Sequence, residues 1–191
     1  MEGKVGRGSR LGAAPWVILP LLAAALVTAG LYAFGTRHVP DYSISLFGKT
    51  GAGTLALKSW LATGLLTLAG VQLVLALWIY GRLPGVWAAS AGVSTGHRVV
   101  GACALLLTLP LAYHCAFAYG VQTKVDARVA VHSLAGCFFY GAFAAKVTIV
   151  RSRRLPAWTL PLAGGVLVSV VMVLWYTSAL WYFNGYRLPI L

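Results

Sequence analysis

The chain has 191 residues, of which 60% are hydrophobic and 9% are charged, and its mean hydropathy is +0.82. A soluble domain of this length could not cover so much apolar surface with so few charged side chains, so the composition excludes a soluble protein and indicates an integral membrane protein. The formal net charge of +12 does not indicate a nucleic-acid partner, because most basic residues stand at the ends of apolar runs, where membrane orientation and the lipid bilayer explain them.

The first half of the chain contains two apolar runs that reach the length of about 20 residues needed to cross a bilayer as a helix. Residues 1–13 are expected to be a cytoplasmic basic N-terminal tail, and residues 14–34 the first transmembrane helix. This run is interpreted as a retained span rather than a signal peptide because it lacks a clear A-x-A cleavage site. Residues 35–53 are expected to form an extracytoplasmic loop, and residues 54–80 the second span.

Three further spans are predicted at residues 97–119, 129–150 and 158–183. Residues 54–183 are thus expected to form a four-helix transmembrane bundle, followed by a C-terminal tail at residues 184–191. The predicted fold class is all-α, a polytopic membrane bundle of five transmembrane helices.

Basic residues in the short loops predict the orientation of the chain in a bacterial plasma membrane. An arrangement with the N-terminus in the cytoplasm and the C-terminus outside places more of them on the cytoplasmic side, and the RSRR segment is the strongest local signal. The cytoplasmic residues are then Lys4, Arg7, Arg10, Arg82, Arg98, Arg151, Arg153 and Arg154, and the outer ones are Arg37, Lys49, Lys58, Lys124, Arg128 and Arg187.

Two histidines flank the short connector between the third and fourth spans. The connector is centred on Thr123, with His114 nine residues before it and His132 nine residues after it. In antiparallel helices that rise about 1.5 Å per residue, an equal distance from the turn means an equal depth. We therefore expect both imidazoles at one level, below the outer surface, on neighbouring helices.

One hypothesis for this pair is a bis-histidine haem b, whose iron takes His114 on one face and His132 on the other. Gly136 follows His132 by four residues, so the flat macrocycle could approach the backbone there. Lys124 and Arg128 lie near the mouth, where the haem propionates would need cations. These five residues form the predicted cofactor site.

Other interpretations of the pair remain open. The two histidines could hydrogen-bond to each other or to neighbouring groups as interhelical packing contacts, or they could belong to a proton relay. They could also bind another metal, but two ligands are too few for a tetrahedral zinc site. His38 on the outer loop could supply a third ligand.

A possible second polar site lies toward the inner end. His97 opens the third span, and Lys146 in the fourth span lies near the same depth. Together they could form a pocket suited to a quinone carbonyl or an anionic group. Alternatively, His97 marks a hydrated helix end and Lys146 extends to the inner interface.

Four other side chains are expected to have no chemical role. Lys58 is expected to extend toward the outer interface. The three cysteines lack metal-ligand or CxxC spacing and are expected to be small buried hydrophobic residues: Cys103, Cys115 and Cys137.

The segments LKSW, GRLPG, LPLAYHC and HSLAGCFFYG carry a resemblance over roughly residues 54–183. The chain resembles a family of small actinobacterial membrane proteins of unknown function. More distantly, through histidines at matched depths, it is similar to the haem-bearing helical bundles of ascorbate-type b cytochromes and ferric-reductase-like transmembrane domains.

The cytochrome resemblance implies a membrane electron-transfer protein with one haem b near the outer face, held by His114 and His132. It also implies a larger redox system with an extracytoplasmic redox partner, leaves a quinone open as a second cofactor, and implies that any enzymatic activity would be that of an oxidoreductase. The inner histidine pair of such bundles is not matched. The alternative is a non-redox structural or assembly subunit, or a small transporter.

Overall fold

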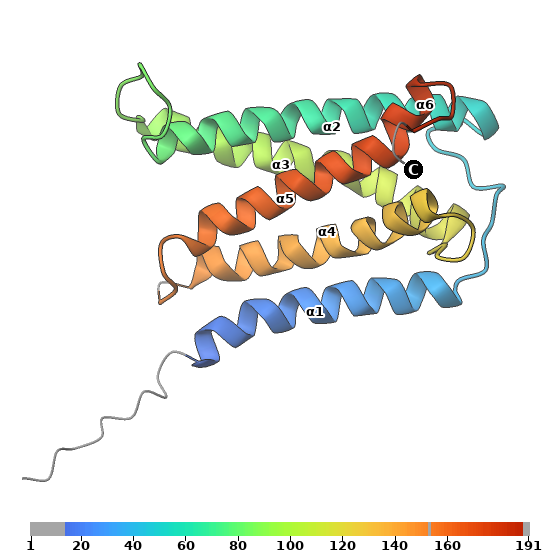
Figure 1. Cartoon of the computed structure of the whole chain (residues 1–191), viewed down its shortest axis with the longest axis horizontal. Coiled ribbons are helices and arrows are strands. Elements are labelled where there is room, and N and C mark those ends of the chain that lie inside the picture. The colour runs from blue at the N-terminus through green and yellow to red at the C-terminus, as the bar shows by residue number, and fades with distance from the viewer. Residues whose placement is uncertain (1–13, 153, 189–191) are drawn as a thin grey trace, which may run out of the picture.

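The computed structural model describes residues 14–152 and 154–188, and within these ranges the chain is all-helical (Figure 1). The tail predicted at residues 1–13 and the last three residues of the C-terminal tail lie outside the described residues. Five helical stretches are each long and apolar enough to cross a membrane. Their elements are α1 (Ala14–Arg37), α2 (Gly51–Ile79), α3 (Ala91–His114) with η1 (Cys115–Tyr119), α4 (Ala127–Arg151), and α5 (Thr159–Trp175) with η2 (Tyr176–Leu180) and α6 (Trp181–Phe183).

The predicted spans agree with these helices in number and differ at their ends. α1 continues three residues beyond residue 34, and α3 begins six residues before residue 97. The segment AGVSTG is the start of α3, directly after the N-cap residue Ser90, although its glycines and small polar residues suggest a loop. The loop predicted at residues 35–53 is shortened from both sides.

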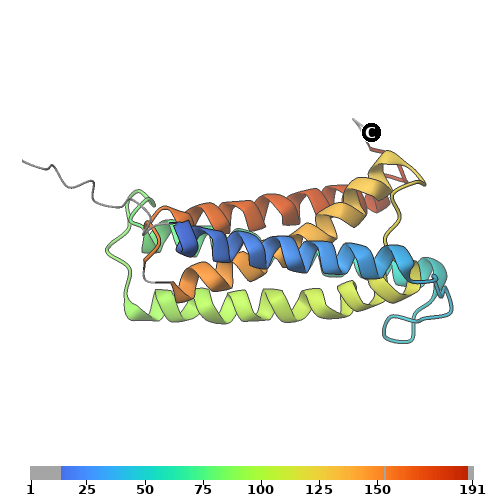
Figure 2. The same ribbon diagram turned by 90° about the horizontal axis from the view of Figure 1, so that it is seen from below.

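The helices pack in the order α3, α2, α5, α4, α1 (Figures 1 and 2). α3 packs mainly on α2, whereas α4 packs between α5 and α1. The predicted four-helix bundle therefore has α1 as a fifth member. Although α3 and α4 follow one another in the sequence, each packs mainly against other helices. The buried core lies between α2, α4 and α5 and contains Leu65, Ala69, Phe139, Ala142, Leu167, Val170 and Val171.

Large apolar side chains cover the outside of the bundle. Leu26 is 71% exposed and Leu106 is 63% exposed, with many similar residues on every helix. Such a surface is a liability in water and is the surface expected of helices that face lipid.

α1 is held against α4 by the close approach of two backbones. A methyl group at Gly141 of α4 would lie 2.6 Å from the Ala24 carbonyl oxygen and would overlap the Thr28 side chain. Only glycine allows this contact, because any Cβ there would displace the backbone of α1.

We name the two ends of the bundle after the residues at the two ends of α4, Asp126 and Arg151. The Asp126 end lies on the right of Figure 1, where α4 begins and α1, η1 and η2 end. The Arg151 end lies on the left, where α4 ends. Both π-helical segments are near the Asp126 end, and such segments are frequent at functional sites because the extra residue redirects side chains.

Candidate functional site

His114, the last residue of α3, lies in a buried polar cluster at the Asp126 end. Its side chain is 2% exposed. The ring Nδ1 is 3.5 Å from Lys58 Nζ of α2, and the ring Nε2 is 3.1 Å from the Ile44 carbonyl oxygen. A carbonyl only accepts and an ammonium only donates, so these partners assign the proton to Nε2 and leave Nδ1 as the acceptor.

Lys58 is turned into the cluster rather than toward the interface. Its ammonium group contacts His114, lies near the Cys115 thiol, and is 4.5 Å from the centre of the Tyr119 ring. The aromatic face attracts the cation. The expectation that Lys58 extends outward is therefore wrong for this structure, because three partners on α3 and η1 hold it inside.

Cys115 lies near both His132 and Lys58. Its thiol is close enough to the two side chains to interact with them electrostatically. His132 Nδ1 is 2.9 Å from Thr177 Oγ1, whose hydroxyl donates to the Val173 carbonyl oxygen at 2.8 Å. Because that hydroxyl has one proton, the His132 ring carries its proton on Nδ1 and leaves Nε2 as an acceptor.

The series of neighbouring residues Ile44, His114, Lys58, Cys115, His132 and Thr177 thus spans five elements and one loop. We call the four central side chains, those of Lys58, His114, Cys115 and His132, the polar cluster. All four can gain or lose a proton. Among the described residues, the carboxylates are engaged elsewhere: Asp126 caps α4 by accepting from Val129 N at 2.7 Å, and Asp41 accepts from Ser43.

Arg128 lies beside the polar cluster and binds η2. Its Nη1 donates to the Thr177 carbonyl oxygen at 3.0 Å, and its guanidinium lies 3.8 Å from the centre of the Trp181 ring. Its Nη2 is also 3.9 Å from an Asp126 carboxylate oxygen. Arg128 is therefore engaged by the protein itself, whereas Lys124 in the adjacent loop is exposed.

His38 does not join the two inner histidines. Its Nε2 lies 2.9 Å from the Phe117 carbonyl oxygen, and its ring stacks on Phe34 with centroids 5.4 Å apart. In residues 14–152 and 154–188, no group of three or more His, Cys, Asp or Glu side chains is placed to hold a metal ion. The third-ligand interpretation of His38 has no support in this geometry.

The predicted haem ligands fit a haem only in part. His132 has the hydrogen-bonded Nδ1 and free Nε2 typical of a metal ligand, and a methyl group at Gly136 would meet nothing within 4 Å. His114, in contrast, already has a partner at each ring nitrogen. As described, the residues do not present two free imidazole nitrogens to one iron, and the bis-histidine haem stays a prediction.

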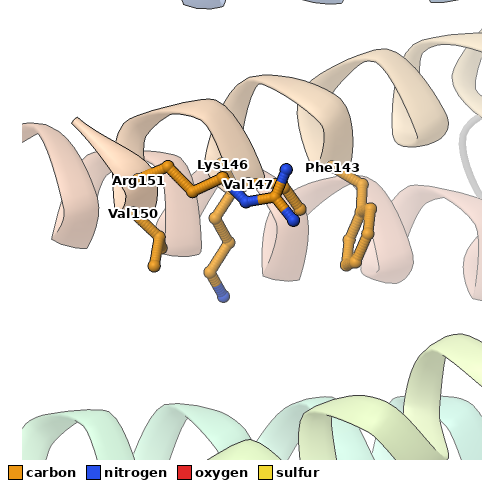
Figure 3. Close-up of a pocket in the computed structure, with 5 residues that line it drawn as sticks. All are labelled: Phe143, Lys146, Val147, Val150 and Arg151. Atoms are coloured by element: carbon orange, nitrogen blue, oxygen red, sulfur yellow. The ribbon is translucent and has the colours of Figure 1, made fainter.

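The second predicted site, at the Arg151 end, contains a pocket of about 190 Å³. Lys146 lines it from α4, together with Phe143, Val147, Val150 and Arg151 (Figure 3). His97 of α3 is close enough to Lys146 for the two charges to interact. His97 does not line the pocket, and the joint polar site of His97 and Lys146 stays a prediction, as does a quinone.

Comparison with known protein families decides where this chain belongs. A family of unknown function (DUF6529) matches residues 17–190. The chain belongs to this family. The match includes α1, which the resemblance over residues 54–183 did not cover. No curated protein and no solved structure matches the chain.

Sequence reasoning missed three members of this site and its surroundings. Lys58 and Cys115 were assigned structural roles, and Thr177 was not considered. One signal was available for Cys115, which directly follows His114, and another for Lys58, which lies seven residues inside α2 and thus beyond the first helical turn.

Proposed function

We propose that this protein is a multi-pass membrane protein that transfers protons through the polar cluster. Five helices of spanning length and a lipid-compatible surface support the membrane location. The basic residues 151–154 and the basic N-terminal tail support a plasma-membrane orientation with the Arg151 end in the cytoplasm and the Asp126 end outside. Ionisable side chains inside a membrane bundle are costly, so they are usually retained for function.

The observation that carries the proposal is the position of His114 between two different partners. Lys58 Nζ faces the ring Nδ1 at 3.5 Å, and the Ile44 carbonyl faces the ring Nε2 at 3.1 Å. A histidine in this position can take a proton at one nitrogen and release one from the other. In this transfer Lys58 gives a proton to Nδ1, and His114 releases its Nε2 proton to water at the loop that contains Ile44.

The other half of the polar cluster restores the proton on Lys58. Neutral Lys58 regains a proton from the Cys115 thiol, which in turn takes one from a protonated His132. The 3.5 Å distance from Lys58 Nζ to His114 Nδ1 and the proximity of Cys115 to Lys58 and His132 support transfers without a large movement. The cluster contains several bases and no carboxylate, so positive charge added at one member repels charge on the next and favours onward transfer.

Proton flux into liposomes tests the proposal. The purified protein is reconstituted in vesicles with an internal pH dye, and an inward proton flux is driven by a potassium diffusion potential. We expect flux above that of empty vesicles, and loss of this flux in His114→Phe, which removes both ring nitrogens at similar volume. His38→Phe is the matched control, because that ring lies at the same end outside the cluster.

Two outcomes would overturn the relay. One is wild-type flux equal to that of empty vesicles, which would leave the cluster as interhelical packing in a structural subunit. The other is full flux in a His114→Phe protein that elutes as a single folded species in detergent.

Haem b is the second candidate function, favoured by the free Nε2 of His132 and the open space over Gly136. A bound haem would supply one-electron transfer, with an outer redox partner receiving or giving the electron. A reduced-minus-oxidised spectrum of protein produced with ample haem distinguishes the candidates. A b-type spectrum that is lost in His114→Ala and in His132→Ala, but kept in His97→Ala, would replace the relay with electron transfer.

A further inference from the structure

The pocket at the Arg151 end combines two cations with an apolar floor. The surface that lines the pocket is apolar: Phe143, Val147 and Val150 contribute to it, and so do the carbon stems of Lys146 and Arg151, whose charged groups lie outside the lining. Figure 3 shows Lys146, Phe143 and Val150 pointing from α4 into the space before the neighbouring helices, with the Arg151 guanidinium turned back along α4 toward Val147. A ligand in this pocket would contact carbon, and a part of it that reaches beyond the pocket would meet the two charged groups.

The two cations have no acidic partner in the part of the chain that the structure describes. Both described carboxylates, Asp41 and Asp126, belong to the opposite end of the bundle, and the single ion pair among the described residues joins Arg128 to Asp126. Lys146 lies within α4, five residues before its end, where an uncompensated charge is costly in a membrane. An anion from outside the protein would remove this cost.

The neighbourhood of Lys146 contains a second unsatisfied group. His97 interacts with the charge on Lys146, and its Nδ1 is buried without a hydrogen-bond partner among the described residues. The His97 backbone is fixed separately, because its carbonyl oxygen accepts from Gln72 Nε2 at 2.5 Å. Both α3 and α4 therefore bring basic groups to this region that no described side chain neutralises.

The size of the pocket limits what can occupy it. About 190 Å³ is below the 300–1,000 Å³ typical of sites that enclose a whole small molecule. A ligand with an anionic head and a long apolar tail meets this limit, because part of the tail can occupy the apolar pocket while the head lies beside the charged groups of Lys146 and Arg151 and the rest of the tail runs along the lipid-facing surface. Basic pockets near helix ends bind lipid headgroups in this way.

From these observations we infer that the pocket lined by Phe143, Lys146 and Arg151 binds an anionic membrane lipid through its headgroup phosphate. Lys146 and Arg151 contact the phosphate, and the apolar residues between them contact the first part of the acyl chain. The site is separate from the polar cluster, so this inference does not depend on the proton-transfer proposal.

Lipid binding is measured on the full-length protein in nanodiscs made of phosphatidylcholine with increasing phosphatidylglycerol, by native mass spectrometry of retained lipid. We expect preferential retention of phosphatidylglycerol. Loss of one headgroup contact by a cation should weaken this preference about fivefold, so Lys146→Met and Arg151→Gln should each show a drop of that size. Arg82→Gln is the matched control, an exposed cation that does not line the pocket.

Three results would overturn the inference. The first is equal retention of phosphatidylglycerol and phosphatidylcholine, and the second is an equal loss in Lys146→Met and Arg82→Gln. The third comes from a parallel arm with inorganic phosphate: if phosphate alone raises the melting temperature of the wild type as much as the lipid does, and Lys146→Met abolishes both effects, the pocket serves a soluble phosphate compound instead. A variant that fails to fold is replaced by Lys146→Gln.

Discussion

The two ends of the bundle treat their buried charges differently. At the Asp126 end, Lys58 contacts His114 and Tyr119 and lies near Cys115, and Arg128 contacts the Thr177 carbonyl and Trp181. At the Arg151 end, Lys146 and Arg151 line a pocket and have no acidic partner among the described residues. At the Asp126 end the charged side chains are bound by other groups of the protein, whereas at the Arg151 end they are available to a ligand.

This difference follows from what each end can supply. The π-helical segments η1 and η2 are at the Asp126 end, and they bring Cys115 and Thr177 to the two histidines. α4 ends at the Arg151 end without such a segment near Lys146, and the other residues that line the pocket, apart from Arg151, are apolar. Hydrogen-bonded polar groups make a self-contained site, whereas unpaired cations over apolar residues make a site that needs a ligand.

The largest expected loss of stability comes from a substitution at the contact between α1 and α4, which supports both ends of the bundle. Gly141→Ala introduces a methyl group 2.6 Å from the Ala24 carbonyl oxygen, so α1 must move away from α4. We expect a loss of about 2–3 kcal/mol in the free energy of unfolding, measured by denaturation in mixed detergent micelles. Gly136→Ala is the matched control on the same helix, because its Cβ would meet nothing within 4 Å. Equal stability of the two variants would contradict the described contact of α1 with α4.

A smaller loss of stability is expected when one hydrogen bond at the Asp126 end is removed. Thr177→Val keeps the shape of the side chain but leaves His132 Nδ1 without its acceptor at 2.9 Å. A buried donor without a partner costs about 1–3 kcal/mol, so we expect a loss of unfolding free energy in that range. Ser178→Ala, which removes a hydroxyl that donates only to the Leu174 carbonyl, should cost less. An equal loss in both variants would mean that His132 gains nothing from Thr177.

At the Arg151 end, removal of a polar group should leave the stability unchanged or raise it. Lys146→Met removes a cation without an acidic partner from apolar surroundings, so in neutral detergent we expect no loss of stability, or a gain of about 0.5–1 kcal/mol. The change is measured in the same denaturation experiment. A loss above 1 kcal/mol in the absence of anionic lipid would show that Lys146 is stabilised within the protein and would remove the contrast between the two ends.

The smallest effect concerns an exposed charge in the loop at the Asp126 end. Hydrogen bonds from the Ser43 hydroxyl and backbone N–H lower the pKa of Asp41 below its ordinary value of 3.8. A lowered folded-state pKa stabilises the protein above the unfolded value, and this contribution is lost as the pH falls below about 3.8. Ser43→Ala should return the pKa of Asp41 toward 3.8, as followed by carboxyl NMR titration. An unchanged titration would show that Ser43 does not bind the carboxylate in solution.

The sequence predicted the number of helices well because crossing a membrane requires long apolar runs, and each of the five is long enough. It placed His114 and His132 at one level, because depth follows from the rise per residue alone, and this placement stays a prediction. It misplaced the start of α3 because the AGVSTG segment has the composition of a loop but continues the helix.

The partners of the two histidines could not be predicted in the same way. Which side chain a residue meets depends on the rotation of each helix about its axis, and the π-helical segments change that rotation between His114 and Tyr119. The packing order, with α3 on α2 and α4 between α1 and α5, also depends on contacts far apart in the sequence. Lys58 was therefore expected to face the interface, although helix packing turns it toward His114.

The π-helical segments also have a genetic consequence. Each residue in a regular helix advances the side-chain direction by about 100°, so the length of η1 fixes how Tyr119 is turned relative to His114, and the length of η2 fixes Trp181 relative to Thr177. A single-codon deletion in CAFAY or YTSAL would shorten the helix by less than one turn and could leave every cluster side chain unchanged. It would nevertheless turn the aromatic rings away from the cations they cover. In these two segments the number of residues therefore matters as much as their identity, because it sets the direction of the side chains that follow.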